Sequence, residues 1–244
     1  MKKILVISDV HANITALEAV LADAGKADEV WCLGDIVGYG PDPNECIERI
    51  RNLPDLTCMM GNHDFAAIGD MALEAFNVDA KKALLWQREM LTKTSKEFLH
   101  TFSQEKKVCG NITLAHGSPR DPIWEYIMNT LVARLNLDFF ETSWCLVGHS
   151  HFQAVFQHHT ESDEMTIEIP GPAEQYEMRE RAILNPGSVG QPRDRDPRAA
   201  YAILHADANI WEPHRVEYDI KSVQKRILDA GLPPRHAERL AGGW

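Results

Sequence analysis

The stretch WCLGDIVGYG, residues 31–40, decides how the chain is organised. A short apolar run ends at Gly34, the carboxylate of Asp35 follows at once, and Gly38 and Gly40 interrupt any regular structure. This pattern is typical of a buried strand that ends in a loop, so it places Asp35 at the edge of a sheet. A carboxylate has two oxygens with spare lone pairs and can be shared by two cations. We therefore predict that Asp35 bridges two metal ions.

Four other apolar runs, residues 3–7, 56–60, 112–115 and 144–147, are predicted strands that also end in polar side chains. Ligands of open α/β sheets bind at the carboxyl ends of the strands, so these side chains should meet at one site. The polar residues that follow the five strands are Asp9, His11, Asp35, Asn62, His63, Asp64, His116, His149 and His151.

Helices are predicted between the strands of the first half. Asn13 is a suitable N-cap for a helix that stops at Gly25, and Asp42 with Glu45 gives the capping-box pattern of a second helix. Residues 65–104 have helical propensity with a mixed charged face, so we interpret them as a helical insertion beside the site.

The second half is predicted to be rich in strands, followed by one helix. Hydrophobic alternation is present near residues 153–157, 165–169, 181–184 and 200–204. A helix is predicted over 220–228, and we expect the terminal segment 231–244 to fray.

The composition limits the class of protein. The 244 residues are 44% hydrophobic and 25% charged, so we expect one globular domain over 1–244. A formal net charge of -11 argues against binding a nucleic-acid polymer, whereas a small phosphate ester held by bound cations is compatible with it. Five cysteines without a Cys-x-x-Cys motif indicate reduced thiols. The apolar run 4–7 is too short for a signal peptide or a membrane span, so we expect a cytoplasmic protein without a membrane partner.

The predicted site has oxygen and imidazole donors but no thiolate. This donor set suits manganese, iron or zinc in a catalytic centre better than a structural zinc site. Each short motif alone is more often a turn or a solvated edge, but five of them at successive strand ends favour a site. We interpret the other histidines as surface or structural residues: His100, His158, His159, His205, His214 and His236.

The order of these motifs resembles that of the calcineurin-like metallophosphoesterases. That family has Asp-x-His, Gly-Asp, Gly-Asn-His followed by Asp or Glu, His, and Gly-His-x-His, and each motif is present in this order over residues 9–151. Residues 32–46, CLGDIVGYGPDPNEC, and 185–193, NPGSVGQPR, are similar to the short bacterial branch of predicted phosphodiesterases. Ala12 departs from the glycine of many relatives, which only restricts the backbone angles there.

The resemblance implies a four-layer αββα sandwich, in which two mixed β-sheets are flanked by helices. It also implies two divalent metal ions that share Asp35. The remaining ligands of the first ion would be Asp9, His11 and His151, and those of the second would be Asn62, His116 and His149. His63 would be an acid outside the coordination spheres, and we expect Asp64 to orient its ring.

Two cations about 3.5 to 4 Å apart can clamp the attacking and leaving oxygens of a phosphate ester and lower the pKa of a bridging water. We therefore expect hydrolysis of a small phosphodiester or a nucleotide pyrophosphate link by in-line attack of a metal-bridging hydroxide. One alternative is a protein serine/threonine phosphatase or another phosphomonoesterase, but that phosphatase branch usually has Glu and a following arginine where this chain has Asp64-Phe65. A noncatalytic scaffold is a second alternative, and the complete set of motifs argues against it. A structural metal protein would need closed coordination, which a shared Asp35 does not give.

Two loops supply candidate substrate contacts. In the loop 117–130, Arg120 could bind phosphate and Trp124 and Tyr126 could stack on a base, unless these aromatic rings pack in the core. In the loop 185–197, Arg193 could bind a second phosphate.

Several of the candidate substrate contacts also have structural alternatives. The arginines of the loop 185–197 could instead pair with Asp194 and Asp196. Asn13 and Tyr39 complete the candidate substrate contacts, with helix capping and packing as their structural alternatives.

Overall fold

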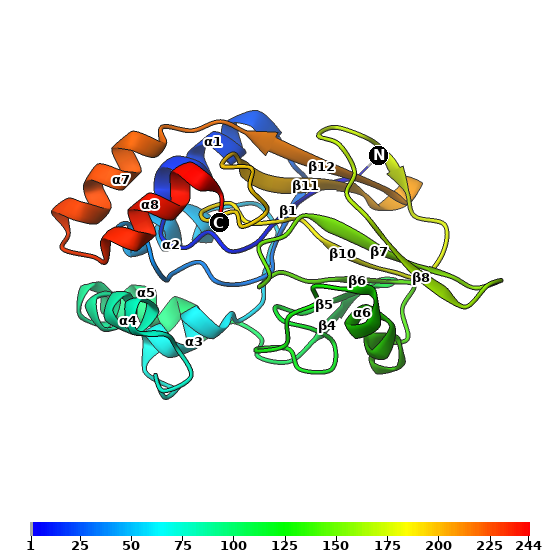
Figure 1. Cartoon of the computed structure of the whole chain (residues 1–244), viewed down its shortest axis with the longest axis horizontal. Helices are drawn as coiled ribbons and strands as arrows, with labels where there is room; N and C mark the ends of the chain where they lie inside the picture. Colours follow the sequence, from blue (N-terminus) through cyan, green and yellow to red (C-terminus); the bar gives the residue numbers. More distant parts are fainter. Residues whose placement is uncertain (1) are drawn as a thin grey trace.

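The structure, a computed structural model, describes residues 2–244. Its strands form two six-stranded sheets that pack face to face (Figure 1). The strand order in the first sheet is β3 (Leu56–Cys58), β2 (Glu29–Cys32), β1 (Lys3–Ile7), β11 (Ala199–His205), β12 (Ile210–Val216) and β9 (Tyr176–Glu177). The order in the second sheet is β4 (Lys107–Cys109), β5 (Ile112–Leu114), β6 (Trp144–Leu146), β10 (Ala182–Asn185), β7 (Ala154–His159) and β8 (Glu164–Glu168).

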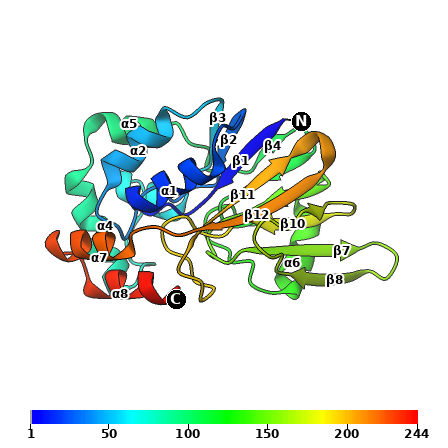
Figure 2. The ribbon, with the colours of Figure 1, turned by 90° about the horizontal axis from the view of Figure 1, so that it is seen from above.

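Helices cover the outer faces of both sheets. The first sheet is covered by α1 (Ile14–Ala24) and α2 (Pro43–Arg51), and the second by α6 (Thr130–Asn136) with the single turn η1 (Leu137–Phe139). Further helices gather at one end of the molecule, as Figures 1 and 2 show: α3 (Asn62–Ile68), α4 (Val78–Met90), α5 (Lys93–Leu99), α7 (Ile220–Asp229) and α8 (Pro234–Gly242). A second single turn, η2 (Ala206–Ala208), joins β11 to β12. The predicted α/β fold of two mixed sheets flanked by helices is confirmed.

Strand β1 shows how the core forms on both faces of a sheet. Leu5 and Ile7 pack with the helices of the outer layer, whereas Ile4 and Val6 pack between the two sheets. Successive side chains of a strand point to opposite faces, so a continuous apolar run suits a strand that is covered on both sides.

Parallel strands bring the predicted site residues to one edge of the sandwich. β1, β2 and β3 are parallel, with Ile7 beside Cys32 and Cys32 beside Cys58. In the second sheet β5, β6 and β10 are also parallel. The loops that follow these strands carry the sequence motifs identified above.

The capping hydrogen bond predicted for the side chain of Asp42 at the start of α2 is not formed. Asp42 precedes the helix, but its side chain makes no capping hydrogen bond. Its carboxylate instead accepts hydrogen bonds from the guanidinium of Arg226 on α7, at 2.9 and 3.1 Å. A charge-assisted contact with an element distant in sequence therefore replaces the local cap.

We predicted that residues 231–244 fray, and for most of this segment the prediction is wrong. Helix α8 occupies most of it, and its Ala237 and Leu240 are buried against Val223 and Ile227 of α7 and Ala83 of α4. The helix has only nine residues, too few to be stable alone in water, so its order comes from this tertiary packing rather than from helix propensity.

The helices of residues 2–244 are short. The longest, α4, has 13 residues, and none of the described helices combines the length and hydrophobicity of a membrane span.

Replacing Leu240 with Ala should lower the free energy of unfolding by about 2 to 5 kcal/mol, because it leaves a cavity between α7 and α8. The matched control is Glu238→Ala on the exposed side of the same helix, which should change stability by less than about 0.5 kcal/mol. Urea unfolding of both variants measures the difference. Equal small effects would contradict the packed position of α8.

Candidate metal centre

Five of the predicted ligands have left-handed backbone conformations. The φ angles are 54° at Asp9, 49° at His11, 56° at Asp35, 63° at His149 and 58° at His151. Such angles are uncommon for residues other than glycine, and their concentration at strand ends is typical of functional sites. Each loop therefore turns sharply where it leaves the sheet, and the side chains converge.

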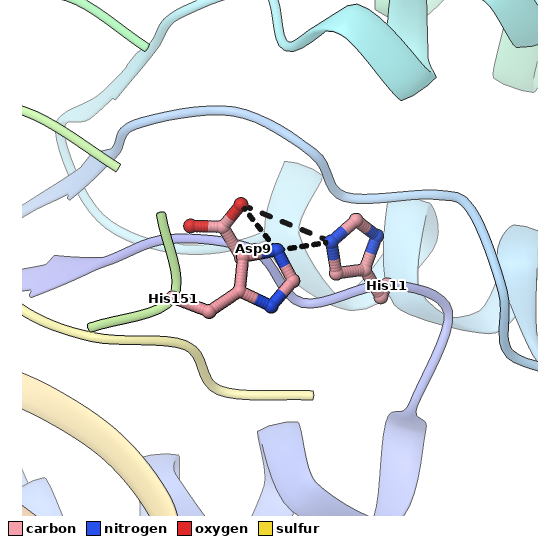
Figure 3. A group of neighbouring side chains, drawn as sticks. All are labelled: Asp9, His11 and His151. Carbon is pink, nitrogen blue, oxygen red and sulfur yellow. Dashed lines mark hydrogen bonds and ion pairs between the residues drawn. The ribbon is translucent and has the colours of Figure 1, made fainter. Parts of the chain in front are cut away.

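The first cluster consists of Asp9, His11 and His151 (Figure 3). His11 Nε2 lies 3.0 Å from His151 Nε2, and the latter lies 3.2 Å from Asp9 Oδ1. The other carboxylate oxygen of Asp9 accepts hydrogen bonds from the Ser8 hydroxyl at 2.6 Å and from the His149 backbone N–H at 3.0 Å. Asp9 Oδ1 itself is buried without a hydrogen-bond donor among the described residues.

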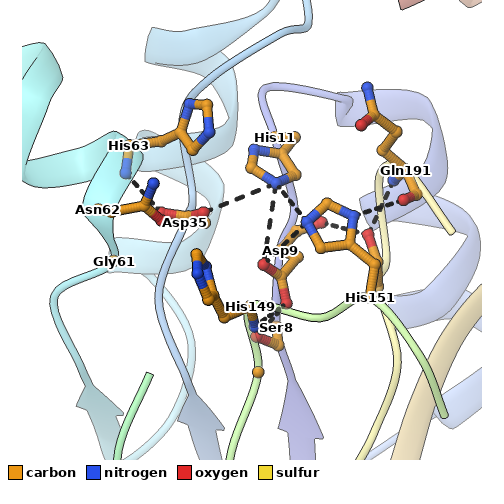
Figure 4. Close-up of polar contacts among 12 residues, drawn as sticks. Ser8, Asp9, His11, Asp35, Gly61, Asn62, His63, His149, His151 and Gln191 are labelled. Carbon is orange, nitrogen blue, oxygen red and sulfur yellow. Dashed lines mark hydrogen bonds and ion pairs between the residues drawn. The ribbon is translucent and has the colours of Figure 1, made fainter. Parts of the chain in front are cut away.

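The second cluster consists of Asp35, His116 and His149, with Asn62 beside it. His116 Nε2 lies 3.2 Å from both His149 Nδ1 and Asn62 Oδ1. Figure 4 shows the first cluster together with Asp35, Asn62 and His149 of the second, in the loops that follow neighbouring strands.

Backbone carbonyl groups fix the orientation of the four clustered histidines. The ring nitrogens that face away from the clusters contact carbonyl oxygens as follows: His11 to Val37 (2.9 Å), His116 to Leu33 (2.8 Å), His149 to Trp124 (3.2 Å) and His151 to Gln191 (2.6 Å). A carbonyl oxygen can only accept, so each of these nitrogens carries the proton. In a neutral imidazole the opposite nitrogen then has a lone pair that points into the cluster.

The two clusters therefore contain unbonded lone pairs that face one another. Within each cluster a pair of imidazole nitrogens lies within about hydrogen-bond distance, and neither nitrogen has a proton to share. Buried polar atoms without partners are costly, and a divalent cation between them removes that cost. These residues thus fit two metal ions.

Asp35 lies between the clusters. Its Oδ1 accepts from the His63 backbone N–H at 2.8 Å, while its Oδ2 lies 3.7 Å from His11 Nε2 and 3.5 Å from His116 Nε2. Burial raises the pKa of the Asp35 carboxyl well above its usual range, and the carboxylates of Asp64 and Asp9 raise it further. Nearby positive charge would reverse this effect, which is a further reason to expect cations here.

Burial also lowers the pKa of the imidazoles of His11, His63, His116, His149 and His151. The neutral form is the one that binds metals.

The ring of His63 stands beside the clusters. It contacts the rings of His11 and Tyr39, with centroids 5.0 and 4.4 Å apart, and its buried Nδ1 has no hydrogen-bond partner among residues 2–244.

The expected contact between Asp64 and the His63 ring is absent. The Asp64 carboxylate instead accepts from the backbone N–H groups of Asp35 (2.7 Å), Val37 (3.0 Å) and Gly61 (3.2 Å). Burial raises the pKa of Asp64 to about 7, and these donors act in the opposite direction. The first turn of α3 directs this side chain towards the loop after β2, so Asp64 holds that loop rather than the histidine.

An aromatic wall borders the clusters. The ring of Phe76 contacts His63 and Trp124, with centroids 5.0 and 5.3 Å apart, and Tyr126 stacks on His149 at 3.8 Å. Tyr126 is 47% exposed and Trp124 is half-buried, so the predicted alternative, in which both pack in the core, is wrong.

Arg193 and Tyr39 are brought to the site. The guanidinium of Arg193 lies 5.5 Å from the centre of the Tyr39 ring and donates to the Gln191 side chain at 2.9 Å. The expected pairing within that loop is not formed, because Asp194 binds Arg215 and Asp196 binds Arg198.

Two other candidate substrate contacts, Arg120 and Asn13, bind other parts of the protein. The guanidinium of Arg120 pairs with Glu125 and lies over Phe139, so it contacts none of the predicted ligands. The Asn13 side chain accepts from Ala16 N–H at 3.1 Å and donates to the Gly190 carbonyl at 3.0 Å, which makes it a structural cap.

Gln87 supports the site but was not among the predicted residues. Gln87 of α4 accepts from Gly38 N–H at 2.6 Å and donates to the Gly40 carbonyl at 2.8 Å, and so holds the loop after β2. A lone glutamine in a helix has no pattern by which sequence reasoning could find it.

Comparison with known proteins agrees with this geometry. Residues 1–209 match the model of the calcineurin-like phosphoesterase superfamily domain. A protein of Methanocaldococcus jannaschii named "Uncharacterized protein MJ0912" is 37% identical over 97% of this chain and 96% of its own length. The crystal structure of a metallophosphoesterase from Sphaerobacter thermophilus has a TM-score of 0.91 at 45% identity and covers 100% of this chain and 99% of that one. A shorter match joins 24% of this chain to 22% of a symmetrical bis(5'-nucleosyl)-tetraphosphatase of Pectobacterium carotovorum, at 36% identity. The chain belongs to the calcineurin-like phosphoesterase superfamily, as its motifs predicted.

Proposed function

We propose that this protein is a dinuclear-metal-dependent phosphoesterase that hydrolyses a small phosphodiester or a nucleotide pyrophosphate link. The observation that carries the proposal is the position of Asp35 Oδ2, 3.7 and 3.5 Å from the ligating nitrogens of two separate histidine clusters. A shared carboxylate between two open clusters is the arrangement that two-metal hydrolysis requires.

Asp9, His11, Asp35 and His151 would hold one divalent ion, and Asp35, Asn62, His116 and His149 the other. Manganese, iron and zinc suit these oxygen and nitrogen donors. When bound, such a pair supplies Lewis-acid activation of water and neutralises charge on the phosphoryl oxygens.

His63 is the proposed general acid. Its ring lies beside the first cluster, and its free Nδ1 leaves it a nitrogen that is not committed to the protein. Burial lowers the pKa of this ring, but the negative charge of a bound phosphate would raise it, so that the ring could hold a proton and donate it to the departing oxygen of the ester. The rings of Tyr39 and Phe76 on either side restrict both its rotation and the access of water.

Arg193 and the aromatic wall are the proposed substrate contacts. A guanidinium can bind the non-bridging oxygens of a phosphoryl group through two donors. Exposed Tyr126 and half-buried Trp124 offer surfaces on which a base can stack. The short match to a tetraphosphatase that acts on dinucleotides supports a substrate of this kind.

Adding Mn²⁺ to metal-stripped protein should raise its stability, because the ions bind only the folded clusters. Free Mn²⁺ at about 100 times its Kd should add about 2.7 kcal/mol for each site, measured by thermal unfolding. His116→Ala should lose much of this gain, while His100→Ala at a surface position should keep it. An equal response of the two variants would argue against the assigned ligands.

The Mn²⁺-loaded protein should hydrolyse bis(4-nitrophenyl) phosphate or a dinucleoside tetraphosphate faster than 4-nitrophenyl phosphate. His63→Ala should lower kcat by about 10²- to 10⁴-fold, because it removes a general acid, with little change in the metal content. Asp35→Asn should lose both activity and one or both ions.

Other outcomes separate the alternatives. A preference for the monoester would identify a phosphomonoesterase. Failure to hydrolyse any of these esters with both ions bound would contradict the enzymatic proposal and favour a binding scaffold.

A further inference from the structure

Helix α8 and the start of α4 border a groove next to the candidate metal centre. The groove has a volume of about 450 Å³ and is lined by Asn77, Val78, Asp79, Arg235, His236 and Arg239. Helices α7 and α8 follow the residues 1–209 that the family model matches. The groove is therefore built in part by a segment outside the matched domain.

Aromatic rings connect the groove to the metal centre. The Tyr39 ring contacts His11 of the first cluster on one side, at 4.6 Å, and His236 of α8 on the other, at 4.9 Å. Arg193 lies over the same tyrosine ring. Tyr39 therefore lies between the metal centre and the groove and is packed against a residue of each.

Three arginines lie beside the groove and the Tyr39 ring. Among the described residues, Arg193 and Arg235 form no ion pair with a carboxylate, although the chain as a whole has a net charge of -11. Arg193 Nε is buried without a hydrogen-bond partner in this part of the chain. Burial is the main cause that lowers the pKa of Arg239 to about 10, and the charge of Arg193 is the next.

The surrounding loops hold this arrangement in place. The Arg195 N–H donates to the Gly243 carbonyl at 2.8 Å, so the loop that carries Arg193 is attached to the end of α8. Arg239 Nε donates to an oxygen of Trp244, the last residue, at 2.6 Å, and Arg235 and Arg239 both lie over the Trp244 ring, 5.6 Å from its centre. The two terminal nitrogens of Arg239 have no hydrogen-bond partner among the described residues. Asp79 also borders the groove, and its carbonyl oxygen accepts from His236 Nε2 at 3.2 Å.

We propose that Arg193, Arg235 and Arg239 form a subsite for the phosphate groups of the substrate that are not cleaved. The ligand class is an oligophosphate, such as the chain between two nucleosides, with one phosphate at the metal centre and the next in the groove. Unpaired guanidinium groups bind such oxygens through charge-assisted hydrogen bonds. This inference rests on the proposed function, and it adds a substrate class.

The first test does not depend on catalysis. Inorganic tripolyphosphate, orthophosphate and citrate are titrated into metal-stripped, full-length protein by calorimetry. Tripolyphosphate should bind most tightly, and Arg239→Gln and Arg235→Gln should each weaken it about tenfold, as expected for the loss of a charged hydrogen bond. The control is Arg51→Gln, an exposed arginine on α2, which should bind as the wild type does.

The second test uses the Mn²⁺-loaded protein. Arg235→Gln, at an exposed position, should raise KM for a dinucleoside tetraphosphate about tenfold and leave kcat/KM for bis(4-nitrophenyl) phosphate unchanged, because the aryl ester has no second phosphate. Equal losses on both substrates would assign the arginine a structural role and overturn the subsite.

The two proposals can fail separately. Tripolyphosphate binding that depends on Arg235 and Arg239, without hydrolysis of any ester, would support the subsite and contradict the enzymatic function. Wild-type protein that does not bind tripolyphosphate, or binds citrate equally well, would overturn the oligophosphate subsite even if the aryl diester is hydrolysed.

Discussion

Four hydrogen bonds from imidazole N–H groups to backbone carbonyl oxygens determine the chemistry of this site. They come from His11, His116, His149 and His151, and they leave the opposite nitrogen of each ring with a lone pair that faces a neighbouring lone pair. A protein interior does not keep such an arrangement without compensation. Two cations between the rings would give that compensation, so the orientation of the rings supports the proposed cofactor.

Backbone hydrogen bonds also join the loops at this edge of the sheet. The Asp9 N–H donates to Gly34 O at 2.9 Å and the His11 N–H to Asp35 O at 3.0 Å, so the loops after β1 and β2 form one unit. Asp64 and Gln87 hold the second of these loops from the helical side. Residues outside the two clusters thus fix the ligand geometry, as expected for preorganised metal sites.

Much of this could be predicted from sequence because the information is local. A strand that ends in a short polar motif indicates both its burial and the direction of its last side chains, which is why Asp9, Asp35 and His116 follow strand ends as expected. The strand β12 was not predicted, since Pro213 interrupts an otherwise regular run. The contacts of Asp42 and Asp64 and the order of α8 depend on partners distant in sequence, and no local pattern encodes them.

The candidate ligands and the proposed subsite lie in different parts of the chain. The ligand clusters lie within the residues that match the superfamily, while α7 and α8 add a charged border beyond them. Under the proposals made above, the metal centre would restrict the type of reaction and this border would restrict which esters bind.

Electron paramagnetic resonance of metal-stripped protein titrated with Mn²⁺ would show whether two ions bind and share the Asp35 carboxylate. The account predicts that two ions bind per chain and that their spins are exchange-coupled, since the Asp35 carboxylate lies between both clusters. A spectrum of isolated ions at every ratio of metal to protein would contradict a centre bridged by Asp35.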